Sequence, residues 1–217
     1  MNVFIAGATG YLGTALAPAL LARGHGVTAL ARTSSAARID ARCRVVIGDA
    51  LDGRTFSAAI DGCETFVHLV GTAHPSPRKA ALFRSVDLVS ARESIAAAVA
   101  ADVGHFVYVS VAQPAPIMKA YQAARANAEE AVRAAGLNAT ILRPWYVLGP
   151  GHRWPLALVP VYWLLERLPA TRDAARRLCL VTRPQMIDSL VWSVEHPAQG
   201  IRMIESPNIR AIRRAPP

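Results

Sequence analysis

The chain begins Met1-Asn-Val-Phe-Ile-Ala-Gly7-Ala-Thr-Gly10-Tyr-Leu-Gly13, so that a short apolar run passes directly into three glycines spaced three residues apart. The apolar run predicts a β-strand, and the residues that follow the turn predict a helix. Gly7 permits a tight reversal, Gly10 removes a Cβ from the path of a ligand, and Gly13 lets the helix pack closely on the strand. The stretch therefore predicts a strand, turn and helix at the start of an α/β fold.

The helix that begins near Tyr11 indicates what the turn could bind. Free amide N–H groups and the positive dipole end of a helix attract phosphate groups. Glycine triplets alone occur in many loops, but a strand before the turn and a helix after it are the context of a dinucleotide-binding turn. The sequence therefore favours binding of a dinucleotide pyrophosphate over a purely structural turn.

Length and composition predict one compact unit. The chain has 217 residues, 53% of them hydrophobic, which is enough for one substantial core and too few for two large domains. The net charge of +9 comes almost wholly from dispersed arginines without a recognition motif, so we expect no nucleic-acid binding. We find no charged leader and no run of eighteen uncharged apolar residues, which predicts a cytoplasmic protein.

The cysteines and histidines do not predict a metal site. Cys43, Cys63 and Cys179 are odd in number and show no Cys-x-x-Cys spacing, which indicates reduced thiols in the cytosol. The six histidines are scattered singly along the chain. His68 falls in the middle of an apolar run, so we expect it to be a packed core residue.

Strand-like and helix-like segments alternate along the chain. Strands are expected at 25–32, 43–49, 65–71, 105–110, 139–143 and 201–205, and helices at 12–23, 55–60, 80–101, 121–135 and 184–194. Such alternation requires right-handed crossovers and a parallel sheet. We therefore predict an α/β fold, a doubly wound parallel sheet of the Rossmann type. The chain would form a single domain over 1–217, with a core at about 1–148 and a small substrate-side cap at about 149–217.

The end of the second strand bears on which dinucleotide is bound. An acidic residue at this place holds the ribose hydroxyls of NAD, whereas an arginine suits the 2′-phosphate of NADP. The strand ends at Arg32, with Arg38 close behind and no acid before Asp40. This favours NADP over NAD. Asp49 follows the third strand in a Gly-Asp-x-x-Asp pattern, which resembles the adenine-side segment of a known dinucleotide-binding superfamily and so implies that Asp49 faces the adenine.

The motif Gly-Ala-Thr-Gly-Tyr-Leu-Gly resembles that of extended and atypical short-chain dehydrogenases/reductases. Leu142-Arg-Pro-Trp-Tyr-Val-Leu-Gly-Pro-Gly151 is similar to the segment beside the nicotinamide in that superfamily. The resemblance and the turn together imply these cofactor-binding residues: Gly7, Thr9, Gly10, Tyr11, Leu12, Gly13, Arg32, Asp49, Ala50, Gly71, Arg125 and Pro144.

The resemblance also implies a catalytic set of serine, tyrosine and lysine. Ser110 ends the fifth strand and would polarise a substrate carbonyl, and Tyr121 would transfer the proton. The lysine expected four residues after the tyrosine is replaced by Arg125. A guanidinium can hold ribose hydroxyls and carry positive charge, but it is not equivalent to an ammonium group. Lys119 lies on roughly the opposite helix face and is not expected to substitute.

Three functions remain open at this stage. The first is an NADP(H)-dependent oxidoreductase acting on a small or lipophilic carbonyl compound, with Ser110, Tyr121 and Arg125 as its catalytic residues. The second is a non-catalytic NADP-binding redox sensor or assembly factor. The third is an enzyme similar to sugar-nucleotide epimerases and dehydratases, which is disfavoured because the domain for the sugar nucleotide is largely missing.

The short C-terminal part resembles the atypical branch, which includes NmrA-like redox regulators and relatives of a complex I accessory subunit. Residues 154–168 combine two tryptophans and a tyrosine with many leucines and valines. We expect this segment to cover the substrate side and receive a lipophilic molecule. The alternatives are a peripheral contact with a membrane or a protein, and plain core packing. The sequence leaves the oligomeric state open.

Overall fold

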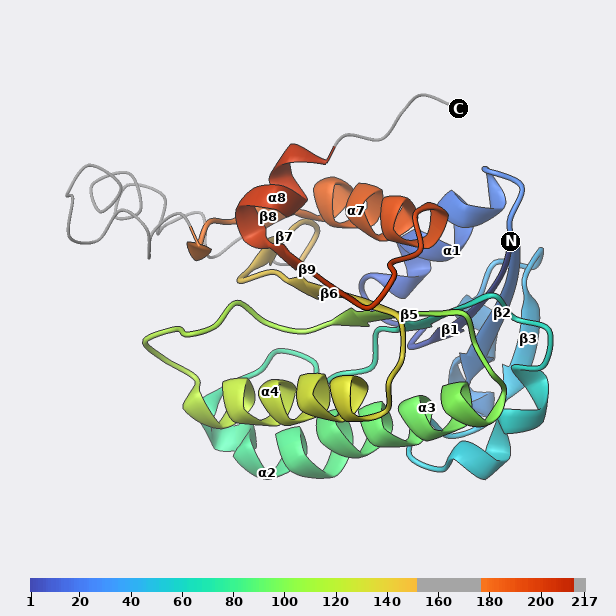
Figure 1. Cartoon of the computed structure of the whole chain (residues 1–217), viewed down its shortest axis with the longest axis horizontal. Coiled ribbons are helices and arrows are strands. Elements are labelled where there is room, and N and C mark those ends of the chain that lie inside the picture. Colours follow the sequence, from blue (N-terminus) through green and yellow to red (C-terminus); the bar gives the residue numbers. More distant parts are fainter. Residues whose placement is uncertain (152–176, 213–217) are drawn as a thin grey trace.

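The computed structural model describes residues 1–151 and 177–212, and its centre is a seven-stranded parallel sheet (Figure 1). Its strands are β1 (Asn2–Ala6), β2 (Gly26–Ala31), β3 (Arg44–Ile47), β4 (Thr65–His68), β5 (His105–Val109), β6 (Ala139–Arg143) and β9 (Ile201–Glu205). They lie in the order β3-β2-β1-β4-β5-β6-β9, and every neighbouring pair is parallel. Strands added outward on both sides of β1 make the doubly wound arrangement. The predicted fold class is confirmed.

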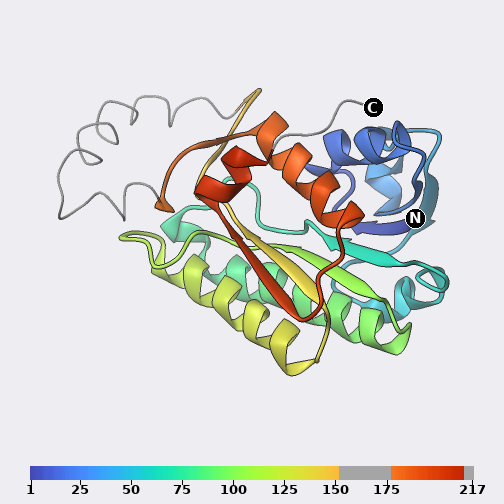
Figure 2. The same cartoon turned by 45° about the horizontal axis from the view of Figure 1, so that its top comes forward.

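Helices cover both faces of the sheet, as Figures 1 and 2 show. The first layer consists of α1 (Gly13–Leu21), α7 (Arg183–Glu195) and α8 (Ser206–Ala211). The second consists of α2 (Ala80–Leu82), a π-helical segment η5 (Phe83–Leu88), α3 (Val89–Ala100) and α4 (Lys119–Ala134). Short 3-10 turns are η1 (Thr33–Arg38), η2 (Gly53–Thr55), η3 (Ser57–Ala59) and η4 (Pro77–Lys79).

Each helical layer buries its own apolar cluster against the sheet. Beneath α1 and α7 the cluster is aliphatic, and Leu16 and Leu190 are fully buried in it. On the opposite face the cluster is built around aromatic rings, with Phe4 and Phe66 at 5.0 Å between ring centres and Phe66 and Phe106 at 5.3 Å. Both clusters form because the central strands carry apolar residues on both faces.

Two segments differ from the sequence-based expectation. The helix expected at 55–60 is instead the pair of 3-10 turns η2 and η3. The helix expected at 80–101 is interrupted by the π-helical turns of η5, which carry the buried Asp87. π-helical turns are rare and often occur at functional sites.

A second, two-stranded parallel sheet lies after the main core. It pairs β7 (Val147–Leu148) with β8 (Val181–Thr182). The helix α7 begins directly after β8 and packs against α1, and β9 then completes the main sheet. The part of the chain after residue 177 is therefore joined to the sheet in two places, at α1 through α7 and at the β6 edge through β9.

Two histidines are buried within the sheet. His68 is fully buried as predicted, and its Nδ1 lies 3.0 Å from Ser94 Oγ. Burial and the charge of Arg125 lower the pKa of His68 to about 3. Burial and the charge of Arg202 lower the pKa of His105 to about 4. Both histidines are therefore neutral in the folded protein at neutral pH.

These lowered pKa values predict acid lability. In the unfolded chain both histidines take up a proton near pH 6.5, while the folded chain resists protonation until pH 3 to 4. The free energy of unfolding is therefore highest above about pH 6.5 and decreases as the pH falls below that value. Each histidine contributes a decrease of up to about 1.4 kcal/mol per pH unit. Urea unfolding from pH 7.5 downward measures this slope. His68→Gln and His105→Gln should each make it shallower, and equal slopes in all three proteins would contradict the assignment.

Candidate functional site

A groove of about 490 Å³ opens at the carboxyl ends of the first four strands. This edge is where open parallel sheets bind ligands. Its lining includes eight of the predicted cofactor residues: Gly7, Thr9, Gly10, Tyr11, Arg32, Asp49, Ala50 and Gly71. The predicted residues converge although they come from separate parts of the chain.

The glycine turn has the close packing that the spacing predicts. Gly7 has a φ of +90°, and a Cβ there would lie 2.8 Å from the backbone carbon of Leu69. A Cβ on Gly13 would overlap the carbonyl oxygen of Gly7 and the backbone of Ala8. Gly10 donates its N–H to the Gly7 carbonyl at 3.0 Å and lines the groove. At Gly7 and Gly10 the turn thus presents backbone to the space that a pyrophosphate requires.

The outer end of the groove is positively charged. Arg32 and Arg38 are exposed and line it from the end of β2 and from η1. Neither arginine forms an ion pair with a residue of the described ranges. Between them the buried Ser35 donates its hydroxyl to the Arg32 carbonyl at 3.1 Å and fixes the turn. Two free guanidinium groups therefore face the groove beside Asp49.

Four predicted cofactor residues lie outside the lining of the groove. Leu12 and Gly13 form the start of α1, behind the turn. Pro144 is buried, and its carbonyl accepts a hydrogen bond from the N–H of Ala112 at 2.9 Å. Arg125 lies directly behind Gly71, so close that a Cβ on this glycine would overlap the guanidinium.

Arg125 is buried and paired. Its Nη2 donates to Asp87 Oδ1 at 2.7 Å, and its Nη1 donates to the Val109 carbonyl at 3.0 Å. Asp87 Oδ2 also accepts the backbone N–H of Thr72 at 3.0 Å and the Thr72 hydroxyl. The arginine that replaces the expected lysine is therefore neutralised by an acid that holds the loop after β4.

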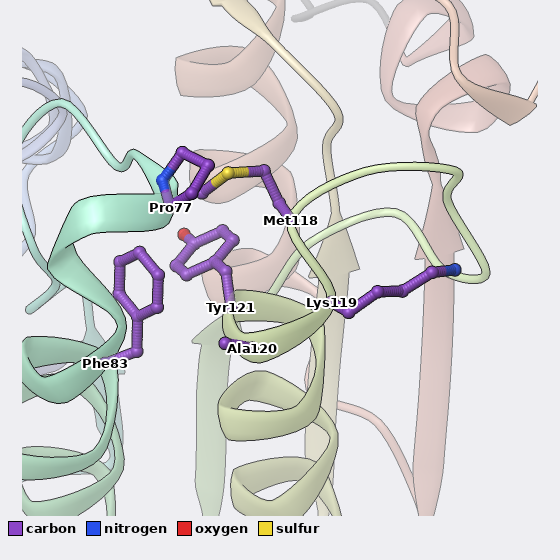
Figure 3. A pocket seen from close by; sticks show the side chains of 6 residues that line it. All are labelled: Pro77, Phe83, Met118, Lys119, Ala120 and Tyr121. Carbon is purple, nitrogen blue, oxygen red and sulfur yellow. The ribbon is translucent and has the colours of Figure 1, made fainter.

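Tyr121 lies against Arg125 and lines a small apolar pocket. The guanidinium carbon is 5.1 Å from the centre of the Tyr121 ring. On its other side the ring packs on Phe83, at 5.0 Å between ring centres. Figure 3 shows it between Phe83 and Met118, in a pocket of about 130 Å³. The Lys119 ammonium instead donates to the Ala115 carbonyl at 2.6 Å.

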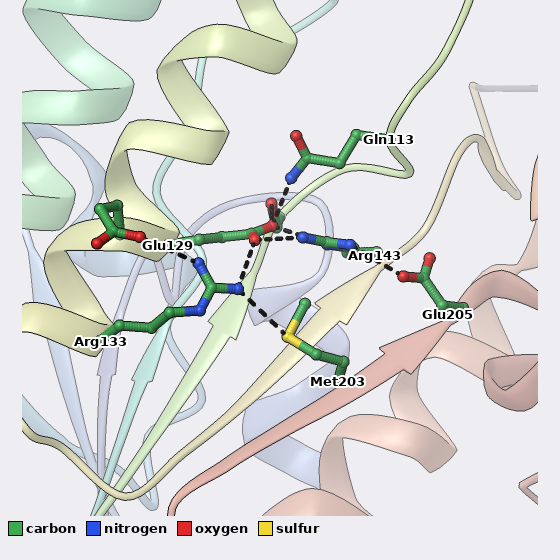
Figure 4. Close-up of polar contacts among 8 residues, drawn as sticks. Gln113, Glu129, Arg133, Arg143, Met203 and Glu205 are labelled. Atoms are coloured by element: carbon green, nitrogen blue, oxygen red, sulfur yellow. Dashed lines mark hydrogen bonds and ion pairs between the residues drawn. The ribbon is translucent and has the colours of Figure 1, made fainter.

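Ser110 belongs to a different network, centred on Glu129 (Figure 4). The Ser110 hydroxyl donates to Glu129 Oε1 at 2.6 Å, in a fully enclosed position. Gln113 donates to the same oxygen at 2.7 Å, and Arg143 donates to both carboxylate oxygens. Burial alone would raise the pKa of Glu129, but hydrogen bonds from Arg143 and Ser110 lower it. The serine proton is thus directed at an ionised carboxylate.

The sequence analysis missed Asp87 and Glu129 as parts of the site. Glu129 follows Arg125 by four residues, a spacing that places both on one face of α4 and could have indicated it. No sequence signal distinguished Asp87, because the π-helical turns that carry it were expected to be ordinary helix. The hydrophobic stretch 154–168, expected over the substrate side, lies outside the described residues.

Within residues 1–151 and 177–212, no three histidine, cysteine or acidic side chains gather as a metal site would require. Over the same ranges, none of the helices combines the length and the apolar character needed to cross a bilayer.

The chain is similar to two curated reductases. It is 32% identical over 176 residues to a ceramide reductase of Caulobacter vibrioides, a match that covers 80% of this chain and 55% of the relative. It is 28% identical over 171 residues to a 4-hydroxy-2-methyl-3-oxo-4-farnesyl-3,4-dihydroquinoline-1-oxide ketoreductase of Stigmatella aurantiaca, covering 69% of this chain and 51% of the relative. The chain thus spans about half the length of these two relatives.

Solved structures share the fold. The dTDP-glucose 4,6-dehydratase DesIV of Streptomyces venezuelae, solved with NAD bound, matches with a TM-score of 0.70 at 21% identity. The match covers 94% of this chain and 75% of the dehydratase. Residues 7–152, which include the glycine turn, the groove lining and strands β2 to β7, match the NAD(P)H-binding family. The chain belongs to the NAD(P)H-binding family and has the fold of the extended short-chain dehydrogenases/reductases.

Proposed function

We propose that the protein is an NADP(H)-dependent reductase that acts on the carbonyl group of a lipophilic substrate. The observation that carries this proposal is the position of Tyr121, between the inner end of the groove and an apolar pocket. Gly71 lines the groove, Arg125 lies behind it, and Tyr121 packs on Arg125. A carbonyl compound held there would have a phenol beside its oxygen and an apolar surface for its chain.

Three residues of the chain would have separate roles in the reduction of a carbonyl group. When bound, a reduced nicotinamide supplies a hydride to a carbonyl carbon. Tyr121 would give its proton to the carbonyl oxygen, so that the ketone becomes an alcohol. Arg125 would hold the tyrosine in place through its stacking, and Asp87 would hold Arg125.

A lipophilic substrate is supported by two observations. The pocket beside Tyr121 is lined mostly by apolar groups, among them Pro77, Phe83 and Met118. The two curated relatives are named for ceramide and for a farnesyl-bearing ring compound, both of which carry long apolar chains. Apolar pockets select apolar ligands because desolvation favours their binding.

A non-catalytic NADP-binding role is the second candidate, because of the hydrogen bond between Ser110 and Glu129. A hydroxyl that donates to a buried carboxylate at 2.6 Å is not free to donate to a substrate carbonyl. A sensor or assembly factor would need the cofactor groove, but it would not need the Ser110 hydroxyl to donate its proton to a substrate.

The cofactor preference is testable at Arg32. We expect NADPH to bind more tightly than NADH, because Arg32 and Arg38 face the place where a 2′-phosphate would lie. Arg32→Ala should weaken NADPH binding about tenfold or more, the effect of losing a charge-assisted hydrogen bond, and leave NADH unchanged. Titration of both cofactors by nicotinamide fluorescence measures this. Arg42→Ala is the matched control, because Arg42 is exposed, pairs with Asp40 and lies outside the groove lining. Tighter binding of NADH would refute the preference.

The proton donor is testable at Tyr121. With NADPH and a series of aliphatic ketones of increasing chain length, turnover should increase with chain length. Tyr121→Phe should lower kcat by about a hundredfold or more and leave the Kd of NADPH unchanged. Arg125→Lys should retain or raise turnover, because it keeps a cation beside Asp87. Full activity in Tyr121→Phe would show that another group carries the proton.

A variant at Ser110 distinguishes between the two candidate functions. If its hydroxyl polarises the substrate, Ser110→Ala should lower kcat by about a hundredfold, as the loss of one oxyanion donor does. If it only completes the Glu129 network, kcat should change little and the melting temperature should fall. Measuring both quantities on the same variant distinguishes these outcomes. Absence of turnover on any ketone, with tight NADPH binding, would favour the non-catalytic role.

A further inference from the structure

Arg183, the first residue of α7, reaches across to the glycine turn. Its guanidinium carbon lies 4.8 Å from the centre of the Tyr11 ring. Its Nη2 donates to Thr14 Oγ1 at 3.1 Å, and the Thr14 hydroxyl donates to the Gly10 carbonyl at 3.0 Å. An arginine from the C-terminal part of the chain therefore contacts the first turn of α1 and a side chain that lines the groove.

The start of α7 is held firmly. Thr182 accepts the Gln185 N–H, the Gln185 side chain accepts the Thr182 N–H, and this reciprocal cap fixes the first turn of the helix. The strand before it, Val181–Thr182, pairs with Val147–Leu148. The chain around Arg183 is therefore placed by the backbone pairing of β8 on one side and by the side-chain cap of α7 on the other.

A glycine makes room for the Tyr11 side chain. A Cβ on Gly149 would overlap the Tyr11 hydroxyl. The Tyr11 side chain is thus in close contact with both Gly149 and Arg183. The contact of Arg183 with Tyr11 is a packed arrangement and not a loose surface encounter.

The charge of Arg183 is not balanced by any described acid. The first turn of α1 contains no acidic residue, and no carboxylate of residues 1–151 or 177–212 lies within 4.0 Å of this guanidinium. The positive charge therefore adds to the dipole at the start of α1, the helix end that the glycine turn predicts as the pyrophosphate site. Such a site attracts a dianionic group more strongly than the helix end alone.

We propose that Arg183, which lies behind the groove lining on Tyr11 and Thr14, supports cofactor binding: its charge attracts the pyrophosphate and its stacking keeps Tyr11 against the groove. The ligand it serves is a nucleoside diphosphate group. The inference requires only that the cofactor binds, and it stands whether or not the protein reduces a ketone.

Two competing ligands distinguish the effect of the Arg183 charge on pyrophosphate binding from a general disturbance of the groove. ADP-ribose contains the pyrophosphate and adenosine does not, and both compete with NADPH for the groove. Arg183→Met should raise the Kd of ADP-ribose about five- to tenfold and leave that of adenosine unchanged. Arg183→Lys should recover most of the loss. The difference between wild type and Arg183→Met should shrink as salt is added, because salt screens the charge.

Arg202→Met is the matched control. Arg202 stacks on Trp192 in the same manner, at 5.1 Å from the ring centre, but it lies on β9 at the far edge of the sheet. Its loss should leave both Kd values unchanged. Equal weakening of ADP-ribose and adenosine in Arg183→Met, or no weakening of either, would overturn the proposal. Arg183→Gln is the second neutral variant if the melting temperature shows that Arg183→Met does not fold.

Discussion

The ion pair between Asp87 and Arg125 holds together the inner end of the site. Both side chains are almost completely buried, and breaking such a pair by removing one partner costs about 3 to 5 kcal/mol. Asp87 fixes the loop after β4 through Thr72, while Arg125 fixes the end of β5 through the Val109 carbonyl. The wall of the groove at Gly71 and the ring of Tyr121 are both placed by this one contact. The arginine therefore acts first as a structural cation.

One helix carries the two polar networks of the site. Tyr121, Arg125 and Glu129 follow each other at intervals of four residues and so share a face of α4. Arg125 forms an ion pair with Asp87, and Tyr121 lines the apolar pocket. Glu129 instead accepts hydrogen bonds from Ser110 and Arg143. The serine and the tyrosine that the sequence pattern pairs are thus engaged by different partners. An ionised Glu129 competes for the serine proton, and the arginine that neutralises it is held in turn by Glu205.

The fold was predictable from the sequence because its signals are local. The apolar strands, the glycine turn and the alternation of elements each depend on a few adjacent residues, and the strands at 139–143 and 201–205 were predicted with the observed bounds. The groove was predictable as far as it follows strand ends, which a parallel sheet brings to one edge. The ion pairs of the site were not predictable from the sequence. Asp87 and Arg125 are 38 residues apart, and only the π-helical turns and the register of α4 bring them together.

The short pairing of β7 with β8 has a consequence for how such proteins diversify. Val147 pairs with Val181 and Leu148 pairs with Thr182, so two stretches that are 34 positions apart in the sequence are neighbours in one parallel ladder. Because the ends are fixed side by side, the free energy of closing the intervening chain depends only weakly on its length. Insertions, deletions or exchanges that keep the pairing of β7 with β8 and the glycine at position 149 would leave the register of the main sheet and the cofactor groove unchanged. The junction is thus a place where a new specificity could be grafted onto an unaltered nucleotide-binding core.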